Sequence, residues 1–156
     1  MSSAVHSTLD SSYDTTSLDV AYVASPSTDG NEETDLMFQY QELEGDVIGQ
    51  MACDDPIGSS MTKCDQAVIS FDGAQLCPPG GGAFCAPLPL WALACHEIGH
   101  AVGLTHGVDA DPAVSDTDAN LGCLVTPLNP YSPVYALGSQ NTALINATYC
   151  VSCLEY

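Results

Sequence analysis

Residues 96–106 read HEIGHAVGLTH, and this short segment holds three of the four histidines of the 156-residue chain. Side chains four residues apart on an α-helix project from the same face, so His96 and His100 would lie one turn apart on a helix. Gly103 tolerates a positive φ and lets such a helix end in a sharp turn, which would bring His106 back toward the other two rings. The segment therefore predicts a cluster of three imidazoles.

This cluster is a suitable ligand set for Zn²⁺, which accepts imidazole nitrogens in a tetrahedral arrangement. Three protein ligands leave the fourth position open, as in catalytic rather than structural zinc sites. Glu97 directly follows the first ligand and could take a proton from a water molecule that the metal activates. Asp109, just past the segment, is a conceivable substitute ligand. The alternative is a helix with two buried histidines and an incidental third.

The segment matches in full the HExxHxxGxxH signature of the metzincin zinc peptidases. With Cys95 before it and Gly122-Cys123 downstream, it most resembles the matrixin-like secreted bacterial metallopeptidases. The resemblance implies an α+β fold with a mixed twisted sheet of four or five strands, an active-site helix, a Met-turn and a C-terminal helix. The zinc ligands and the catalytic base that it implies are His96, His100, His106 and Glu97.

The resemblance also implies how a substrate would bind. Residues 47–53 would form an edge strand that pairs with an extended peptide through backbone hydrogen bonds. Residues 127–131 would line the pocket for the side chain after the cleaved bond. The substrate-binding residues implied in this way are Val47, Ile48, Gly49, Pro127 and Tyr131.

The chain departs from the family pattern at two places. The family has a methionine in a tight turn beneath the zinc, and Leu124 stands at that position here. Leucine fills a similar volume, and the methionine is not a ligand in the family, so the exchange need not abolish activity. The first strand of the family sheet is not evident before Val5.

The periodicity of apolar residues predicts the other elements. Val5, Leu9 and Tyr13 are spaced four apart, as on one face of a short amphipathic helix. Apolar or alternating runs predict strands at 18–23, 36–40, 47–52 and 67–71. Pro89 suits a first helical turn, so the central helix is expected at 90–103, and a last helix at 137–149. Loops are expected at 25–34, 77–89, 106–122 and 127–133.

Charge excludes two classes of partner. The chain has twenty acidic residues and one basic residue, Lys63, for a net charge of -19. Nucleic acids require a cationic surface, and an anionic membrane would repel this chain, so neither is an expected partner. Asp116, Asp118 and Asn120 space oxygen atoms at alternate positions, as calcium loops do, with a solvated acidic loop as the alternative.

Eight cysteines favour disulfides in an oxidising, extracellular compartment, although they permit 105 pairings. Pairing Cys95 with Cys123 would tie the active-site helix of the family to the turn beneath the zinc. Two further pairs, Cys53 with Cys64 and Cys77 with Cys85, would close short loops. The two cysteines left over, Cys150 and Cys153, form a local C-x-x-C. The first residues are not a signal peptide, so the export signal of a secreted protein is absent from this chain.

The length fits one domain, residues 1–156. The sequence therefore predicts a secreted zinc endopeptidase that acts on proteins or peptides. The alternative is a non-catalytic or weakly active extracellular structural or binding protein that keeps the metzincin fold. The substrate, the cleavage preference and the oligomeric state do not follow from the sequence.

Overall fold

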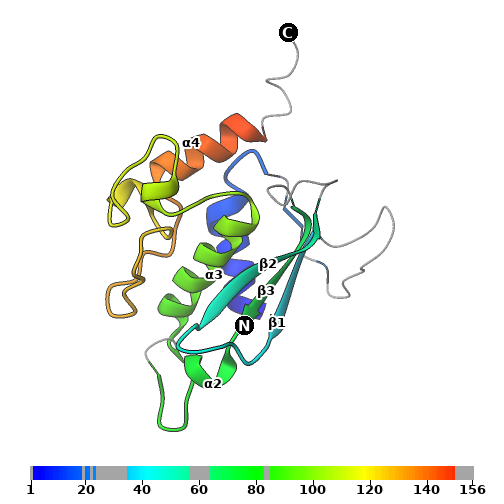
Figure 1. Ribbon diagram of the computed structural model, residues 1–156, viewed down its shortest axis with the longest axis vertical. Coiled ribbons are helices and arrows are strands. Elements are labelled where there is room, and N and C mark those ends of the chain that lie inside the picture. The colour runs from blue at the N-terminus through cyan, green and yellow to red at the C-terminus, as the bar shows by residue number, and fades with distance from the viewer. Residues whose placement is uncertain are drawn as a thin grey trace.

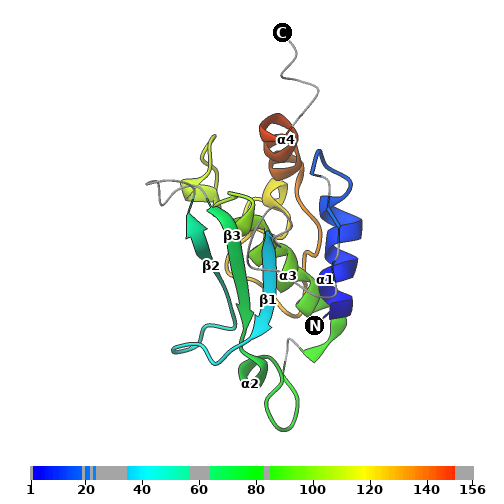
Figure 2. The same cartoon turned by 90° about the vertical axis from the view of Figure 1, so that its right-hand side faces the viewer.

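The computed structural model describes residues 2–18, 20–21, 23, 35–56, 64–82 and 85–149. They form an α+β fold in which a small sheet lies beside the long helix α3, Pro87–Ala101 (Figure 1). Helix α3 contacts strands of this sheet and also packs against the N-terminal helix α1, Ser2–Thr8 (Figure 2). The α+β class expected from the sequence is confirmed.

The sheet contains the strands β1, β2 and β3 in the order β1-β3-β2. Their bounds are Leu36–Tyr40, Gly49–Pro56 and Cys64–Phe71. β1 runs parallel to β3 and β2 runs antiparallel to it, so the sheet is mixed, as expected. Among the described strands, β2 therefore lies at an edge, as expected for the strand of residues 47–53. It begins at Gly49 and ends at Pro56, so Val47 and Ile48 lie outside it.

The expected number of strands is wrong for the described residues, which contain three and not four or five. In the segment 18–23, no strand includes Leu18, Val20, Ala21 or Val23. Residues 19 and 22 lie outside the described residues. Leu18 and Val20 are partly buried against the core. Their apolar pattern therefore reflects side-chain packing without strand pairing. The loop expected at 25–34 also lies outside the described residues.

The N-terminal helix is confirmed and continues from α1 into a π-helical turn, η1, at Leu9–Tyr13. Val5, Leu9 and Tyr13 are all buried, as their spacing predicted. A short helix, α2, spans Gly73–Leu76 and is capped by Asp72, whose carboxylate accepts hydrogen bonds from the backbone N–H groups of Ala74 and Gln75.

The central and last helices differ from expectation at their ends. Helix α3 begins at Pro87, three residues before the expected start. Proline fits the first turn of a helix, because the N–H that it lacks would have no hydrogen-bond partner there. Helix α4 spans Ser139–Thr148, inside the expected 137–149. Short 3-10 turns, η3 and η4, span Gly107–Asp109 and Ala119–Leu121. None of the described helices combines the length and apolarity that a membrane span requires.

The core lies where α3 meets the sheet, α1 and the segment before α4. Its largest fully buried apolar side chains are Tyr13, Phe71, Ile69, Leu93, Ile98, Leu121, Leu124 and Ile145. Ile98 lies on α3 between two histidines, so the packing of the core fixes the helix that carries them.

Three predicted disulfides are confirmed, namely Cys53–Cys64, Cys77–Cys85 and Cys95–Cys123. The described residues include no unpaired cysteine, and Cys150 and Cys153 lie outside them. Three disulfides fit an oxidising, extracellular environment.

Candidate metal centre

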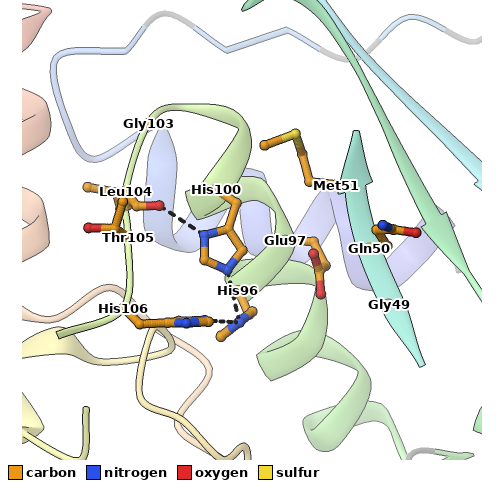
Figure 3. Close-up of a pocket in the computed structure, with 10 residues that line it drawn as sticks. All are labelled: Gly49, Gln50, Met51, His96, Glu97, His100, Gly103, Leu104, Thr105 and His106. Carbon is orange, nitrogen blue, oxygen red and sulfur yellow. Dashed lines mark hydrogen bonds between the residues drawn. The ribbon is translucent and has the colours of Figure 1, made fainter. Parts of the chain in front are cut away.

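Three histidines converge at the C-terminal end of α3, as the sequence predicted. The Nε2 atom of His96 lies 3.1 Å from that of His100 and 3.2 Å from that of His106 (Figure 3). His96 and His100 come from α3, and His106 follows the turn at Gly103, which has a φ of 88°. The helix ends there because the N–H of Leu104 bonds back to the carbonyl of Gly99.

The distances fit a single metal ion. Zinc binds imidazole nitrogens at about 2.0–2.1 Å, so two ligand atoms of a tetrahedral site lie ~3.3 Å apart. The candidate ligand atoms of the three histidines lie within 4.8 Å of one another. They are the one such group of His, Cys, Asp or Glu within the described residues, and this group does not include Asp109.

The second ring nitrogen of two histidines is held by a backbone carbonyl. His96 Nδ1 lies 2.9 Å from the carbonyl oxygen of Cys123, and His100 Nδ1 lies 2.9 Å from that of Leu104. A carbonyl can only accept, so each Nδ1 donates, and each neutral ring then presents an unprotonated Nε2 to the cluster. Two unprotonated nitrogens cannot hydrogen-bond to each other, and a shared cation would satisfy both.

Burial also keeps these rings neutral. It lowers the pKa of His96 to about 4, against a smaller opposing effect of the bond to Cys123. Burial likewise lowers the pKa of His100. Burial thus favours the neutral form of both rings, which is the form that binds a metal.

Glu97 lies between the histidines and the edge strand β2 (Figure 3). Its side chain is buried, and burial raises the pKa of Glu97 from 4.5 to about 7 against a smaller opposing effect of the Met51 backbone. β2 passes so close that a Cβ atom on Gly49 would come within 2.9 Å of Glu97 Oε1. Glycine is therefore needed where the strand crosses the carboxylate.

A cavity of about 510 Å³ opens over the cluster. Its lining residues are Gly49, Gln50, Met51, His96, Glu97, His100, Gly103, Leu104, Thr105 and His106. Of the implied substrate-binding residues, Gly49 lines it, whereas Val47, Ile48, Pro127 and Tyr131 do not. Sequence reasoning assigned no role to Leu104 and Thr105, which occupy unspecified positions of the signature.

Leu124 is fully buried beneath α3. A Cβ atom on Gly99 would come within 2.7 Å of Leu124 Cδ2, so this leucine fills the space below the helix between the two histidines. The neighbouring disulfide, Cys95–Cys123, joins α3 to the segment whose carbonyl orients His96. The helix that carries His96 and His100 is thus supported from below by both a covalent bond and an apolar contact.

The acidic loop uses its oxygen atoms for local hydrogen bonds. Asp116 Oδ1 accepts from the N–H of Val108, and Asp118 Oδ1 accepts from the N–H of Asn120. Asn120 Oδ1 accepts from the hydroxyl of Ser139. These bonds order the loop, and calcium binding by it stays a prediction.

Comparisons with protein-family models, curated proteins and solved structures find no match for this chain. The function is therefore inferred from the residues and their geometry. The chemistry available is a three-histidine group able to hold a metal ion, with a buried carboxyl group and an open cavity beside it.

Proposed function

We propose that this protein is a secreted zinc endopeptidase of the metzincin type, which hydrolyses peptide bonds in proteins or peptides. The observation that carries the proposal is the convergence of His96, His100 and His106 beside the buried carboxyl group of Glu97. The complete HExxHxxGxxH signature supports the same conclusion.

Zinc fits the ligands better than calcium or magnesium, which prefer oxygen. Three imidazoles with a fourth position left open are typical of catalytic zinc. When bound, zinc would supply a Lewis acid that polarises the scissile carbonyl and makes water more acidic.

Glu97 would act as the general base. A pKa of about 7 suits a group that must first take a proton from water and then return it to the leaving amine near neutral pH. Glu97 lines the cavity, so its carboxyl group would face a bound substrate. The raised pKa that suits this role would come from burial and not from a charged side chain.

The edge strand β2 would bind the peptide. The carbonyl of Ile48 accepts a hydrogen bond from Asp72 at the end of β3, and backbone groups on a strand alternate in direction, so those of Gly49 and Met51 point away from β3. Gly49 and Met51 therefore present backbone donors and acceptors at the cavity. An extended peptide can add to such an edge through its own backbone, which favours endopeptidase activity with side-chain selectivity set elsewhere.

Dependence of cleavage on zinc tests the proposal. The purified chain is expected to degrade a denatured protein substrate, to stop when a zinc chelator is added, and to recover when zinc is restored. Substrate fragments are followed by mass spectrometry, and bound zinc is measured in the same samples. Zinc bound at one ion per chain without any cleavage would instead favour the non-catalytic extracellular protein.

Gly49→Ala is expected to lower kcat/KM by about 100-fold while leaving zinc affinity unchanged, because displacements near 1 Å in a catalytic site cost this much. The new methyl group would lie 2.9 Å from Glu97 Oε1 and 3.0 Å from Leu93 Cδ1, so either β2 or Glu97 must shift. Ala52→Ser, at an exposed position of the same strand, is the matched control. Wild-type kinetics in Gly49→Ala would show that the close approach of β2 has no part in catalysis.

A further inference from the structure

Among the side chains of η1, that of Tyr13 forms a hydrogen bond to the backbone of the residue just before His96, the first proposed metal ligand. Its side chain is 0% exposed, and its hydroxyl donates a 2.6 Å hydrogen bond to the carbonyl oxygen of Cys95. Cys95 directly precedes His96 on α3. A residue from the N-terminal segment thus contacts the helical turn that begins the metal-binding motif.

The same hydroxyl approaches the next turn of α3. A Cβ atom on Gly99 would lie 3.2 Å from Tyr13 Oη and 2.7 Å from Leu124 Cδ2. The turn from Cys95 to Gly99 is therefore bordered by the tyrosine hydroxyl and by the leucine side chain. Because glycine adds no side chain, the helix can lie close to both.

Two restraints on this turn act through Cys123. Its sulfur is bonded to that of Cys95, and its carbonyl accepts the hydrogen bond from His96 Nδ1. Tyr13 adds a third restraint from a separate part of the chain. A carbonyl oxygen has two lone pairs, so that of Cys95 can accept from Tyr13 and keep its helical hydrogen bond.

We propose that Tyr13 is a positioning residue for the metal centre, whose hydroxyl fixes the placement of the α3 turn that carries His96 and His100. The inference rests on the metal-binding part of the proposed function and not on peptidase activity. Functional sites require their ligands to be held within about 0.5 Å, and a buried hydrogen bond from outside the helix supplies such a restraint. The residue acts through Cys95 and touches neither metal nor substrate.

Thr8 provides a matched comparison on the same N-terminal segment. It is also buried, and its hydroxyl donates a 3.3 Å hydrogen bond to the carbonyl of Trp91, one turn earlier on α3. No metal ligand lies in that turn. Thr8→Val and Tyr13→Phe each remove one buried hydroxyl and keep the shape of the side chain, so they separate support of the fold from placement of the ligands.

The experiment compares wild type, Tyr13→Phe and Thr8→Val in metal-free and metal-loaded forms. Zinc affinity is measured by competition with a chelator, and the ligand geometry by the visible absorption spectrum of the Co²⁺-loaded protein. Tyr13→Phe is expected to lower zinc affinity by about 10–100-fold, as the loss of supporting partners of metal ligands does, and to alter the Co²⁺ spectrum. Thr8→Val is expected to leave both unchanged, although both variants lower the thermal stability of the metal-free protein.

Three results would overturn the inference. One is wild-type zinc affinity together with a wild-type Co²⁺ spectrum in Tyr13→Phe. Another is an equal loss of affinity in both variants, which would assign Tyr13 to support of the fold alone. The third is a wild-type protein that binds neither ion, which removes the metal centre itself. Wild-type metal binding without peptide cleavage, combined with a selective effect of Tyr13→Phe, would support the inference and contradict only the peptidase proposal.

Discussion

Replacing Glu97 with glutamine is expected to lower kcat/KM for peptide cleavage by about 10²–10⁴-fold, the usual contribution of a general base. Glutamine has nearly the same shape, but it cannot take a proton from water. Because Glu97 is not one of the three clustered histidines, zinc affinity should stay at the wild-type value. Cleavage rates and zinc affinity are measured on the same preparations.

The same variant has a second expected effect, on the pH dependence of stability in the metal-free protein. The pKa of Glu97 is raised from 4.5 to about 7 on folding, so between these values the folded protein binds more protons than the unfolded chain. The stability that this group contributes is present below the lower value and is lost as pH rises through the higher one. Glu97→Gln removes this loss, so its free energy of unfolding should exceed that of wild type increasingly as pH rises.

Denaturant unfolding of both metal-free proteins at about pH 5 and about pH 8 measures this difference. Full cleavage activity in Glu97→Gln would exclude Glu97 as the base. A stability difference that does not change with pH would show that the carboxyl group ionises in the folded protein as it does in the unfolded chain.

Replacing His100 with alanine is expected to lower zinc affinity by more than about 100-fold, since loss of an outer partner of a ligand alone costs about 10–100-fold. His100 supplies one of three nitrogen ligands, and its Nε2 atom lies 3.1 Å from that of His96. Zinc in excess should raise the unfolding temperature of wild type through binding to the folded state. It should not do so for the variant. Thermal unfolding with and without zinc, together with chelator competition, measures both effects.

His6→Gln is the control, because His6 is the fourth histidine of the chain and lies on α1, outside the cluster. This variant should keep the zinc affinity of wild type and the zinc-dependent rise in unfolding temperature. Equal zinc binding by His100→Ala and wild type would place the metal elsewhere in the protein and would remove the basis of the proposed function.

The histidine cluster could be predicted from the sequence because its geometry is local. The spacing of His96 and His100 sets their common face, and the turn at Gly103 sets the return of His106. The disulfide Cys95–Cys123 joins residues 28 apart, and its pairing came from the family resemblance and not from spacing alone. Local rules therefore predicted the histidine cluster, and the family resemblance predicted the disulfide that supports it.

Other features depend on contacts that no local pattern records. The bond from Tyr13 to Cys95 spans 82 residues, and periodicity showed only that Tyr13 faces inward. The close approach of Gly49 to Glu97 could be predicted only with knowledge of how β2 crosses α3. The strand expected at 18–23 is wrong for the four residues of this segment that the structure describes, because an apolar pattern indicates burial and does not show a hydrogen-bonded partner strand.

The edge of β2 that would receive a peptide could equally receive another copy of the same strand, which is a common route to aggregation. The far end of β2 carries features that oppose such pairing. Asp54 and Asp55 are exposed, the register with β3 shifts between Cys53 and Asp55, and Pro56 has no N–H to donate. A net charge of -19 also makes two copies repel each other. These features oppose pairing of β2 with another copy of itself and would leave the edge open to a peptide. Lowering the pH toward the isoelectric point reduces the net charge and should weaken the repulsion between copies.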